Sequence, residues 1–429
     1  MTWRDRWRAM RIDLTPLRTS RDFRLLFTAG TVFYFGSMVS YVAIPFGVYR
    51  LTGSNFLVGA IGLVELVPLI VFGLYGGALA DHVDRRRLLI ATGLAQAVLT
   101  AILAANAFRS TPRLWVIFVV AALLTSASAL QRPSREALMP RTVTHAEIPA
   151  ANALTSLGMQ LGVLGGPAVG GLLIAFVGVG WCFVLDVCAL VVATGLFARM
   201  RPYPHQVETT PPSLRSIRDG LVYAAGRRDL LGTYLVDLAA MFLAFPVVLF
   251  PALADDVFKA PQYLGLLYSA ETVGALLATA FSGWIGRVHH HGRMIVIAAA
   301  VYGGFIALSG LAPSLWLAAV LLGCAGAADM ISAVFRGTIW NQTIPEEMRG
   351  RLAGVEMLSY SIGPLGGQVR AGMVADLWSV RGAIASGGLA CVLGVLATGA
   401  ALRDFWGYDA RTDPHAVAER AVRMTQGES

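Results

Sequence analysis

Apolar runs of about 20 residues recur along almost the whole chain, each bounded by charges, glycine or proline. This is the length that an α-helix needs to cross the hydrocarbon core of a bilayer. The composition agrees, because 56% of the residues are hydrophobic and only 14% are charged, against about 25% in an average soluble domain. These values exclude a disordered chain and disfavour an ordinary soluble enzyme. They predict an all-α membrane protein that crosses the bilayer many times.

The apolar runs give twelve candidate transmembrane helices, and a polar stretch over 200–228 separates six of them from the other six. They lie at 24–49, 56–80, 88–108, 113–133, 149–176, 180–199, 229–253, 261–285, 293–311, 314–336, 351–377 and 382–402. We therefore predict four parts. These are an N-terminal six-helix half over 1–200, a central loop over 201–228, a C-terminal six-helix half over 229–402 and a tail over 403–429.

Basic residues gather in alternate connections between the predicted spans. Of the 34 Lys and Arg residues, 28 lie in the tails and the even-numbered connections. The other six are Arg50, Arg109, Arg113, Lys259, Arg370 and Arg381. The excess of positive charge marks the cytoplasmic side, so both tails and the central loop are predicted to be cytoplasmic. Because the basic residues are distributed in this way, the net charge of +8 does not indicate a nucleic-acid partner, and we expect none.

The chain also repeats itself, since a shift of 206 residues places Pro45 on Pro251 and Glu65 on Glu271. The glutamate match is informative, because carboxylates inside a membrane are rare. The repeat predicts two homologous six-helix bundles around an axis along the membrane normal. Such a duplication places a binding site between the halves, near the middle of the membrane.

Two motifs carry a resemblance to the major facilitator superfamily. The connection after the second span reads Gly77-Ala-Leu-Ala-Asp81-His-Val-Asp84-Arg85-Arg86-Arg87, and it resembles the cytoplasmic signature of that superfamily. It departs from the signature where His82 and Asp84 stand. The fifth span contains Gly162, Gly166, Pro167, Gly170 and Gly171 in a pattern similar to the signature of its antiporters. Shorter pieces at 16–24, 151–154 and 349–351 resemble the bacterial branch that includes the enterobactin exporter.

The resemblance implies the major facilitator fold, with twelve helices in two pseudo-symmetric bundles, and roles for both motifs. Gly77, Asp81 and Arg85 would form a gate, in which Asp81 holds the halves together on the cytoplasmic side near the start of the eleventh span. Arg85, Arg86 and Arg87 would otherwise serve only as positive-inside anchors, and this interpretation is favoured for Arg86 and Arg87. The bare glycine face of the fifth span allows another helix to approach closely, and its antiporter role would add sliding or sealing along that face.

Five carboxylates lie within the apolar spans, namely Glu65, Asp186, Asp237, Glu271 and Asp329. A charged carboxylate costs about 2.5–3.5 kcal/mol on insertion scales, so each must be protonated, paired or in a wet cavity. The repeated Glu65 and Glu271 are the first choice for proton coupling or for binding a cationic part of a substrate. The alternative is a hydrogen bond to neighbouring backbone in a helix bend.

The resemblance places spans 7 and 10, and with them Asp237 and Asp329, along the central cavity. Asp329 lies two helical turns before Arg336 on the same face, so a structural ion pair is at least as strong an alternative as a gate. Asp186, in the peripheral span 6, is interpreted as structural.

Span 1 carries Tyr34, Ser37 and Tyr41 on one helical face. The resemblance makes span 1 a cavity-lining helix, and such a stripe suits an amphipathic solute with aromatic character. Interfacial tyrosines with ordinary helix packing are the alternative. Span 4 has no arginine in its interior, although many proton-driven exporters of the superfamily have one there.

The sequence thus predicts a secondary active exporter of a small siderophore-like or drug-like compound, driven by proton antiport. Antibiotic or multidrug efflux without a siderophore role, and proton-symport import, remain as alternatives. Because nucleotide-binding, zinc-protease and serine-hydrolase motifs are absent, an enzyme is not expected. We expect no cofactor and no metal site. The expected partners are the small-molecule substrate, protons and the lipid of a bacterial plasma membrane, and we expect the carrier to work as a monomer.

Overall fold

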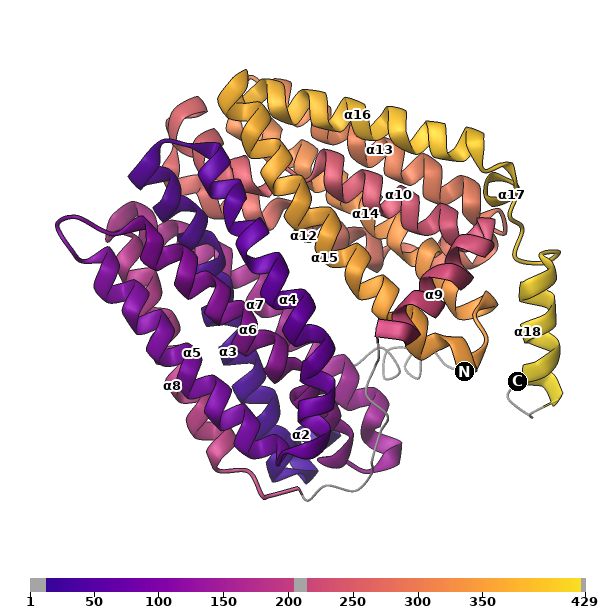
Figure 1. The fold of residues 1–429 in the computed structure, drawn as a ribbon, viewed down its shortest axis with the longest axis horizontal. Helices are drawn as coiled ribbons and strands as arrows, with labels where there is room; N and C mark the ends of the chain where they lie inside the picture. Colours follow the sequence, from indigo (N-terminus) through magenta and orange to yellow (C-terminus); the bar gives the residue numbers. More distant parts are fainter. Residues whose placement is uncertain (1–12, 204–213, 426–429) are drawn as a thin grey trace, which may run out of the picture. The chain divides into compact units, whose positions relative to one another are not determined.

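The computed structural model describes residues 13–203 and 214–425, with the side chains of 74–82, 214–217 and several positions between 346 and 360 outside the description. The described residues form helices joined by short turns, with no strand among them (Figure 1). They fall into two compact units. The first covers the described parts of Met1–Ile44 and Val71–Pro211, and the second those of Pro45–Ile70 and Pro212–Ser429.

The helices up to residue 203 lie in or enter the first unit. They are α2 (Thr15–Thr19), α3 (Arg21–Thr52), α4 (Asn55–His82), α5 (Arg85–Ala107), α6 (Leu114–Leu138), α7 (Ile148–Phe176) and α8 (Val179–Ala198). Two short 3₁₀ turns, η1 (Met139–Arg141) and η2 (His145–Glu147), join α6 to α7. The last turns of α3 and the first half of α4 pack with the second unit instead. The boundaries of the two compact units thus differ from those of the six-helix halves that the sequence repeat predicts. The four-part division stays a prediction.

The remaining helices belong to the second unit. They are α9 (Leu214–Gly226), α10 (Arg228–Ala244), α11 (Phe250–Ala252), α12 (Leu264–Ala280), α13 (His291–Leu311), α14 (Leu315–Thr343), α15 (Glu346–Leu377), α16 (Val380–Ala401), α17 (Arg403–Trp406) and α18 (Pro414–Thr425). Helix α16 lies along α13 (Figure 1).

Each of the twelve predicted spans coincides with a helical segment, and ten helices of the described residues are long and apolar enough to cross a membrane. The other two positions hold α12 and α15. Helix α12 has 17 residues and ends in the 3₁₀ segment Ser282–Arg287, while α15 carries several charged residues. A multi-pass membrane protein is therefore confirmed, and the number twelve stays a prediction.

The predicted span 229–253 is interrupted, because α10 ends at Ala244 and Phe245 has an extended backbone. Pro246 lacks an N–H group and disfavours a helical backbone for Phe245, the residue before it, and α10 ends there. The carbonyl oxygens freed at the break are satisfied by side chains of other helices. Arg370 of α15 donates to the carbonyl oxygen of Leu243 at 2.6 Å, and the Tyr302 hydroxyl of α13 donates to that of Ala244 at 3.1 Å. Backbone breaks at membrane depth are tolerated only where such partners exist.

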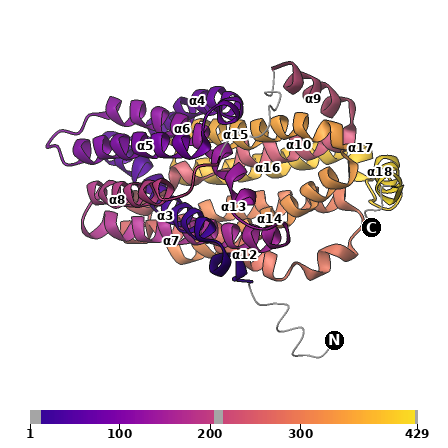
Figure 2. The same ribbon diagram turned by 90° about the horizontal axis from the view of Figure 1, so that it is seen from below.

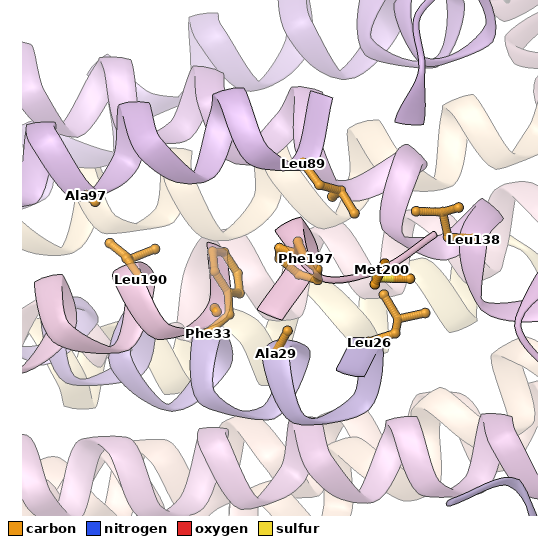
Figure 3. Packing of buried hydrophobic residues seen from close by; sticks show 10 residues of the cluster. Leu26, Ala29, Phe33, Leu89, Ala97, Leu138, Leu190, Phe197 and Met200 are labelled. Carbon is orange, nitrogen blue, oxygen red and sulfur yellow. The ribbon is translucent and has the colours of Figure 1, made fainter. Parts of the chain in front are cut away.

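The first unit is held by an apolar cluster between α3, α5 and α8, and α5 lies beside α8 (Figure 2). Its labelled members are Leu26, Ala29, Phe33, Leu89, Ala97, Leu138, Leu190, Phe197 and Met200 (Figure 3). Helix α7 adds its glycine face to α3. A Cβ at Gly162 would come within 2.9 Å of the Tyr34 Cβ, and one at Gly166 within 3.0 Å of the Phe35 carbonyl oxygen. Only small residues permit this approach.

Candidate functional site

Arg336 of α14 lies at the centre of a polar group inside the second unit. Its side chain is 4% exposed, and its Nη2 lies 2.9 Å from Asp237 Oδ1 of α10 and 3.8 Å from Asp329 Oδ1. Its Nη1 donates to the Ser332 hydroxyl at 2.9 Å. One buried guanidinium thus brings together two of the carboxylates that the sequence selects.

Asp237 is almost completely buried, since its side chain is 1% exposed. Its second carboxylate oxygen accepts a hydrogen bond from the Ser359 hydroxyl of α15 at 2.9 Å. The Asp237 carboxylate therefore ties α10 to both α14 and α15. Asp329 is held less tightly by Arg336, because the Asp329 side chain is 32% exposed and its distance to Arg336 is longer.

Glu271 reaches the same region from α12. Its backbone lies against Gly326 of α14, where a Cβ would come within 2.6 Å of the Glu271 Cα. Asp329 follows Gly326 by three residues, almost one helical turn. The Glu271 Oε1 atom is buried without a hydrogen-bond partner among the described residues.

Arg336, Asp237, Asp329 and Glu271 are together called the Arg336 cluster below. When all four groups are ionised, three negative charges face one positive charge. A buried carboxylate without a partner is costly in an apolar surrounding. The cluster is therefore suited to take up protons, or a cationic group, and to release them when its surroundings change.

Glu65 is not part of this cluster. It is half-buried on α4 in the section that packs with the second unit, and no described residue forms a hydrogen bond or ion pair with it. One turn earlier, Gly62 lies against α15, where a Cβ would come within 2.8 Å of the Leu365 carbonyl oxygen. The sequence repeat pairs Glu65 with Glu271, but their local surroundings differ.

The three residues of the predicted tyrosine and serine face of α3 have different surroundings in the structure. Tyr34 is half-buried and accepts a hydrogen bond from Arg135 Nη2 of α6 at 2.6 Å. Ser37 is half-buried, and Tyr41 is 39% exposed. Of the three, Tyr34 alone lines the cavity that α3, α6 and α7 surround. Asp186, interpreted as structural, accepts a hydrogen bond from Ser40 of α3.

The predicted gate motif is only partly visible. The surroundings of Gly77 and the side chain of Asp81 lie outside the description, and Arg85 is half-buried. Asp84, a departure from the superfamily signature, caps the N-terminus of α5 by accepting hydrogen bonds from the backbone N–H groups of Arg86 at 2.9 Å and Arg87 at 3.2 Å. The gate role of the motif stays a prediction.

The glycine motif of the fifth span is buried. Gly162, Gly166, Pro167, Gly170 and Gly171 all lie on the inner side of α7, and the face that they form packs on α3. This arrangement accounts for the small residues by packing. An additional role in transport stays a prediction.

Comparison with known proteins supplies the identity of the fold and the family. The profile of the transmembrane secretion effector family matches residues 12–421, almost the entire chain. The chain belongs to this family. It is a transporter of the major facilitator type and not an enzyme.

Curated relatives of the transporter include enterobactin exporters. EntS from Shigella flexneri is 28% identical over 400 residues, which cover 90% of this chain and 93% of that protein. EntS from Escherichia coli O1:K1 / APEC is 28% identical over 394 residues with the same coverage. Both are named as enterobactin exporters.

Solved structures of other transporters share the fold. The nucleoside transporter NupG aligns with a TM-score of 0.70 at 11% identity, covering 91% of this chain and 100% of that chain. A bacterial homologue of the iron transporter ferroportin, in an inward-facing state, gives 0.67 at 16% identity, covering 90% and 98%. At these identities the likeness shows the fold alone.

Two arginines of the transporter have a part that the sequence did not predict. Arg135 was placed in the loop after span 4, but α6 continues through Pro133 to Leu138 and so carries Arg135 to Tyr34. Arg86 was interpreted as a membrane anchor, but its Nε donates to the carbonyl oxygen of Phe197, near the end of α8, at 3.4 Å. Both arginines follow a predicted span boundary within a few residues, and helix ends are the least certain feature of a sequence.

Proposed function

We propose that this transporter is a secondary active exporter of a small amphipathic compound, siderophore-like or drug-like, driven by proton antiport through alternating access. The observation that carries the proposal is the Arg336 cluster, in which Asp237 and Asp329 contact one buried guanidinium and the backbone of Glu271 packs against the same helix at Gly326. The enterobactin exporters among the relatives support the direction of transport and favour a siderophore-like compound. A drug-like compound is the alternative substrate, and proton-symport import is the alternative direction.

Asp237 is the fixed anion of the cluster. It has a short contact with Arg336 and a hydrogen bond from Ser359, so its negative charge is compensated. The positive charge of Arg336 is then balanced mainly by Asp237, and little of it is left to stabilise negative charges on Asp329 and Glu271. We infer that these two carboxylates exchange protons with the aqueous phases during the transport cycle.

Proton exchange would be coupled to conformation through the surroundings of these two groups. Asp329 is 32% exposed on its side chain, while Glu271 Oε1 is buried. A change that wets Glu271 lowers the cost of its charge and releases a proton, whereas closure around it favours proton uptake. Coupling of this kind needs two states with different access and no covalent chemistry.

We place the transporter in the bacterial plasma membrane with both tails and the central loop on the cytoplasmic side, on the basis of the distribution of basic residues. We further propose that the chain forms two homologous six-helix halves with the substrate-binding site between them, and that the carrier works as a monomer.

The first experiment is mass spectrometry of medium and cytoplasm from a strain that lacks this gene, grown with and without iron. Retention of a siderophore in the cells, only under iron starvation and reversed by the wild-type gene, is the expected result. An unchanged siderophore profile, with another metabolite or an added dye retained instead, would assign the protein to drug-like efflux. Depletion of a compound from the deletion strain's cytoplasm would indicate import and contradict the proposal.

A further inference from the structure

The first unit contains a cavity of about 210 Å³ between α3, α6, η1 and α7. Tyr34 and Arg135 lie in its wall together with Asn152 and Ser156 of α7. All lining residues belong to the same unit. The Arg336 cluster consists of residues of the other unit, so the two groups share no residue.

Arg135 gives the cavity its electrostatic character. Its Nη2 donates to the Tyr34 hydroxyl at 2.6 Å, and the guanidinium carbon lies 4.5 Å from the centre of the Tyr34 ring and 5.2 Å from that of Phe33. These contacts orient the guanidinium, and cation–π contacts of this length are favourable. Neither contact supplies an anion.

The remaining donors of Arg135 have no acceptor among the described residues. Nη1 is buried and forms no hydrogen bond, and no described carboxylate forms an ion pair with this guanidinium. Glu136 also lines the cavity, but its Oε1 accepts a hydrogen bond from Arg132 Nε at 2.8 Å. The net positive charge at the cavity thus belongs to Arg135. A purely structural role, in which Arg135 joins α6 to α3 through Tyr34, explains the position of Nη2 but not the burial of Nη1.

The other walls fit a ring. Leu26, Phe27 and Met159 are apolar, and a Cβ at Gly30 would meet no atom within 4 Å, so the α3 wall is open at that point. An apolar cavity of about 150 Å³ holds a benzene molecule. The volume here therefore accommodates one aromatic ring with an anionic substituent, while Asn152 and Ser156 offer further hydrogen-bond donors.

We propose that this cavity binds an anionic, ring-bearing group of the transported compound, an aromatic carboxylate or phenolate, with Arg135 as its counter-ion. The inference rests on the proposed export function, since it names the chemistry of the substrate. A cationic ring is disfavoured by Arg135, and a neutral ring could accept a hydrogen bond from the buried Nη1 but would not balance the positive charge of the guanidinium.

The test uses the full-length protein in detergent micelles and salicylate as the probe, with binding followed by saturation-transfer NMR and titration. Benzylamine is the cationic control and salicylamide the neutral control. Gly30→Leu fills the cavity, and Ser156→Leu fills it from α7. Gly195→Leu adds the same bulk on the exposed face of α8, where a Cβ also meets nothing within 4 Å, and serves as the matched control.

We expect saturation of salicylate but not of benzylamine. The dissociation constant for salicylate should rise about tenfold or more in Arg135→Gln, because a charge-assisted hydrogen bond is lost. It should be partly restored in Arg135→Lys. Both cavity-filling variants should abolish binding, and Gly195→Leu should leave it unchanged. Equal binding of salicylate to Gly30→Leu and Gly195→Leu, or a preference for benzylamine, would overturn the proposal.

Efflux assays in cells, together with lipid competition, distinguish failure of the cavity as a binding site from failure of the export function. Salicylate binding that is lost in the variants, in a protein that shows no efflux in cells, would keep the site and reject the exporter. Efflux that proceeds unchanged in Arg135→Gln and Ser156→Leu would keep the exporter and reject the site. Displacement of salicylate by phosphatidylglycerol, with no effect of the variants on efflux, would assign the cavity to a lipid headgroup and also reject the proposal.

Discussion

Asp376 Oδ1 accepts a hydrogen bond from the backbone N–H of Asn55 at 2.8 Å, although 321 residues separate the two in the sequence. The same carboxylate accepts from the backbone N–H of Phe56 at 3.0 Å and from the Ser54 hydroxyl at 2.7 Å. It therefore caps the N-terminus of α4 from the last turn of α15. A negative charge is favourable there, because the first N–H groups of a helix have no partner inside it.

We predict that Asp376→Ala destabilises the protein by about 1–2 kcal/mol, the usual cost of losing an N-terminal cap. Asp376→Asn should cost less, since an amide oxygen can still accept one of these hydrogen bonds. The measurement is thermal unfolding in detergent. Asp404→Ala is the control, because Asp404 is an exposed acid paired with the exposed Arg228. Equal melting temperatures for Asp376→Ala and Asp404→Ala would contradict the capping role.

The Arg336 cluster predicts unequal effects of its two aspartates on stability. Arg336→Met should cost about 3–5 kcal/mol, since it leaves the buried Asp237 carboxylate without a counter-charge. Asp237→Asn should also be strongly destabilising, whereas Asp329→Asn should be mild because that contact is 3.8 Å long and partly exposed. The double change Arg336→Met with Asp237→Asn should recover part of the loss. A strictly additive double variant would show that the two residues are not coupled.

Proton coupling predicts a particular pattern in transport. Glu271→Gln should abolish transport driven by a pH gradient in proteoliposomes while leaving substrate binding measurable, because the glutamine cannot release a proton. The substrate is the compound retained by the deletion strain. Glu65→Gln tests the second copy of the repeat, and Asp404→Asn is the control. If Glu271→Gln and Glu65→Gln both transported at the wild-type rate, neither glutamate would couple protons.

The tail provides a prediction of pH dependence outside the membrane. Hydrogen bonds from the Arg411 side chain and backbone N–H lower the pKa of Asp409 from 3.8 to about 2. Because the pKa is lowered in the folded state, the stabilisation is present above about pH 4 and is lost as the pH falls through about 2. Asp409 also faces His290 at 3.8 Å, and Ala410 donates to the His289 carbonyl oxygen at 3.0 Å.

Hydrogen exchange of the backbone at 409–413 measures this effect. At pH 7 the amides should be less protected in Asp409→Asn than in the wild type. After correction for intrinsic exchange rates, the difference should narrow below pH 4, be small at pH 2 and vanish below it. A difference that persists unchanged at pH 2 would show that the charge of Asp409 does not hold the tail.

The sequence predicted the positions of the helices well because hydrophobic length is a local property. The runs at 88–108 and 180–199 became α5 (Arg85–Ala107) and α8 (Val179–Ala198) with small changes at the ends. It could not predict the interruption after Ala244, because Pro246 alone does not show whether the freed carbonyl groups will find partners. Those partners, Arg370 and Tyr302, come from helices that follow much later in the chain.

The candidate site shows the same division. The rarity of carboxylates within apolar runs was enough to select Asp237, Glu271 and Asp329. Their relationship was hidden, because Arg336 was predicted to pair with Asp329, its neighbour along the helix, whereas its shorter contact is with Asp237 on another helix. Arg135 was overlooked because a helix end determines whether a residue belongs to a loop or to a cavity wall.

The sequence by itself therefore determined that the chain is a multi-pass helical membrane protein and which of its charged residues are costly enough to need a purpose. Both follow from the free energy of transferring single segments and side chains into an apolar phase, which depends on the residues alone. Only the tertiary structure decided which charges compensate each other. Compensation depends on distances between helices, and those distances are set by packing, as where Gly326 lacks a side chain and so lets the backbone of α12 come close.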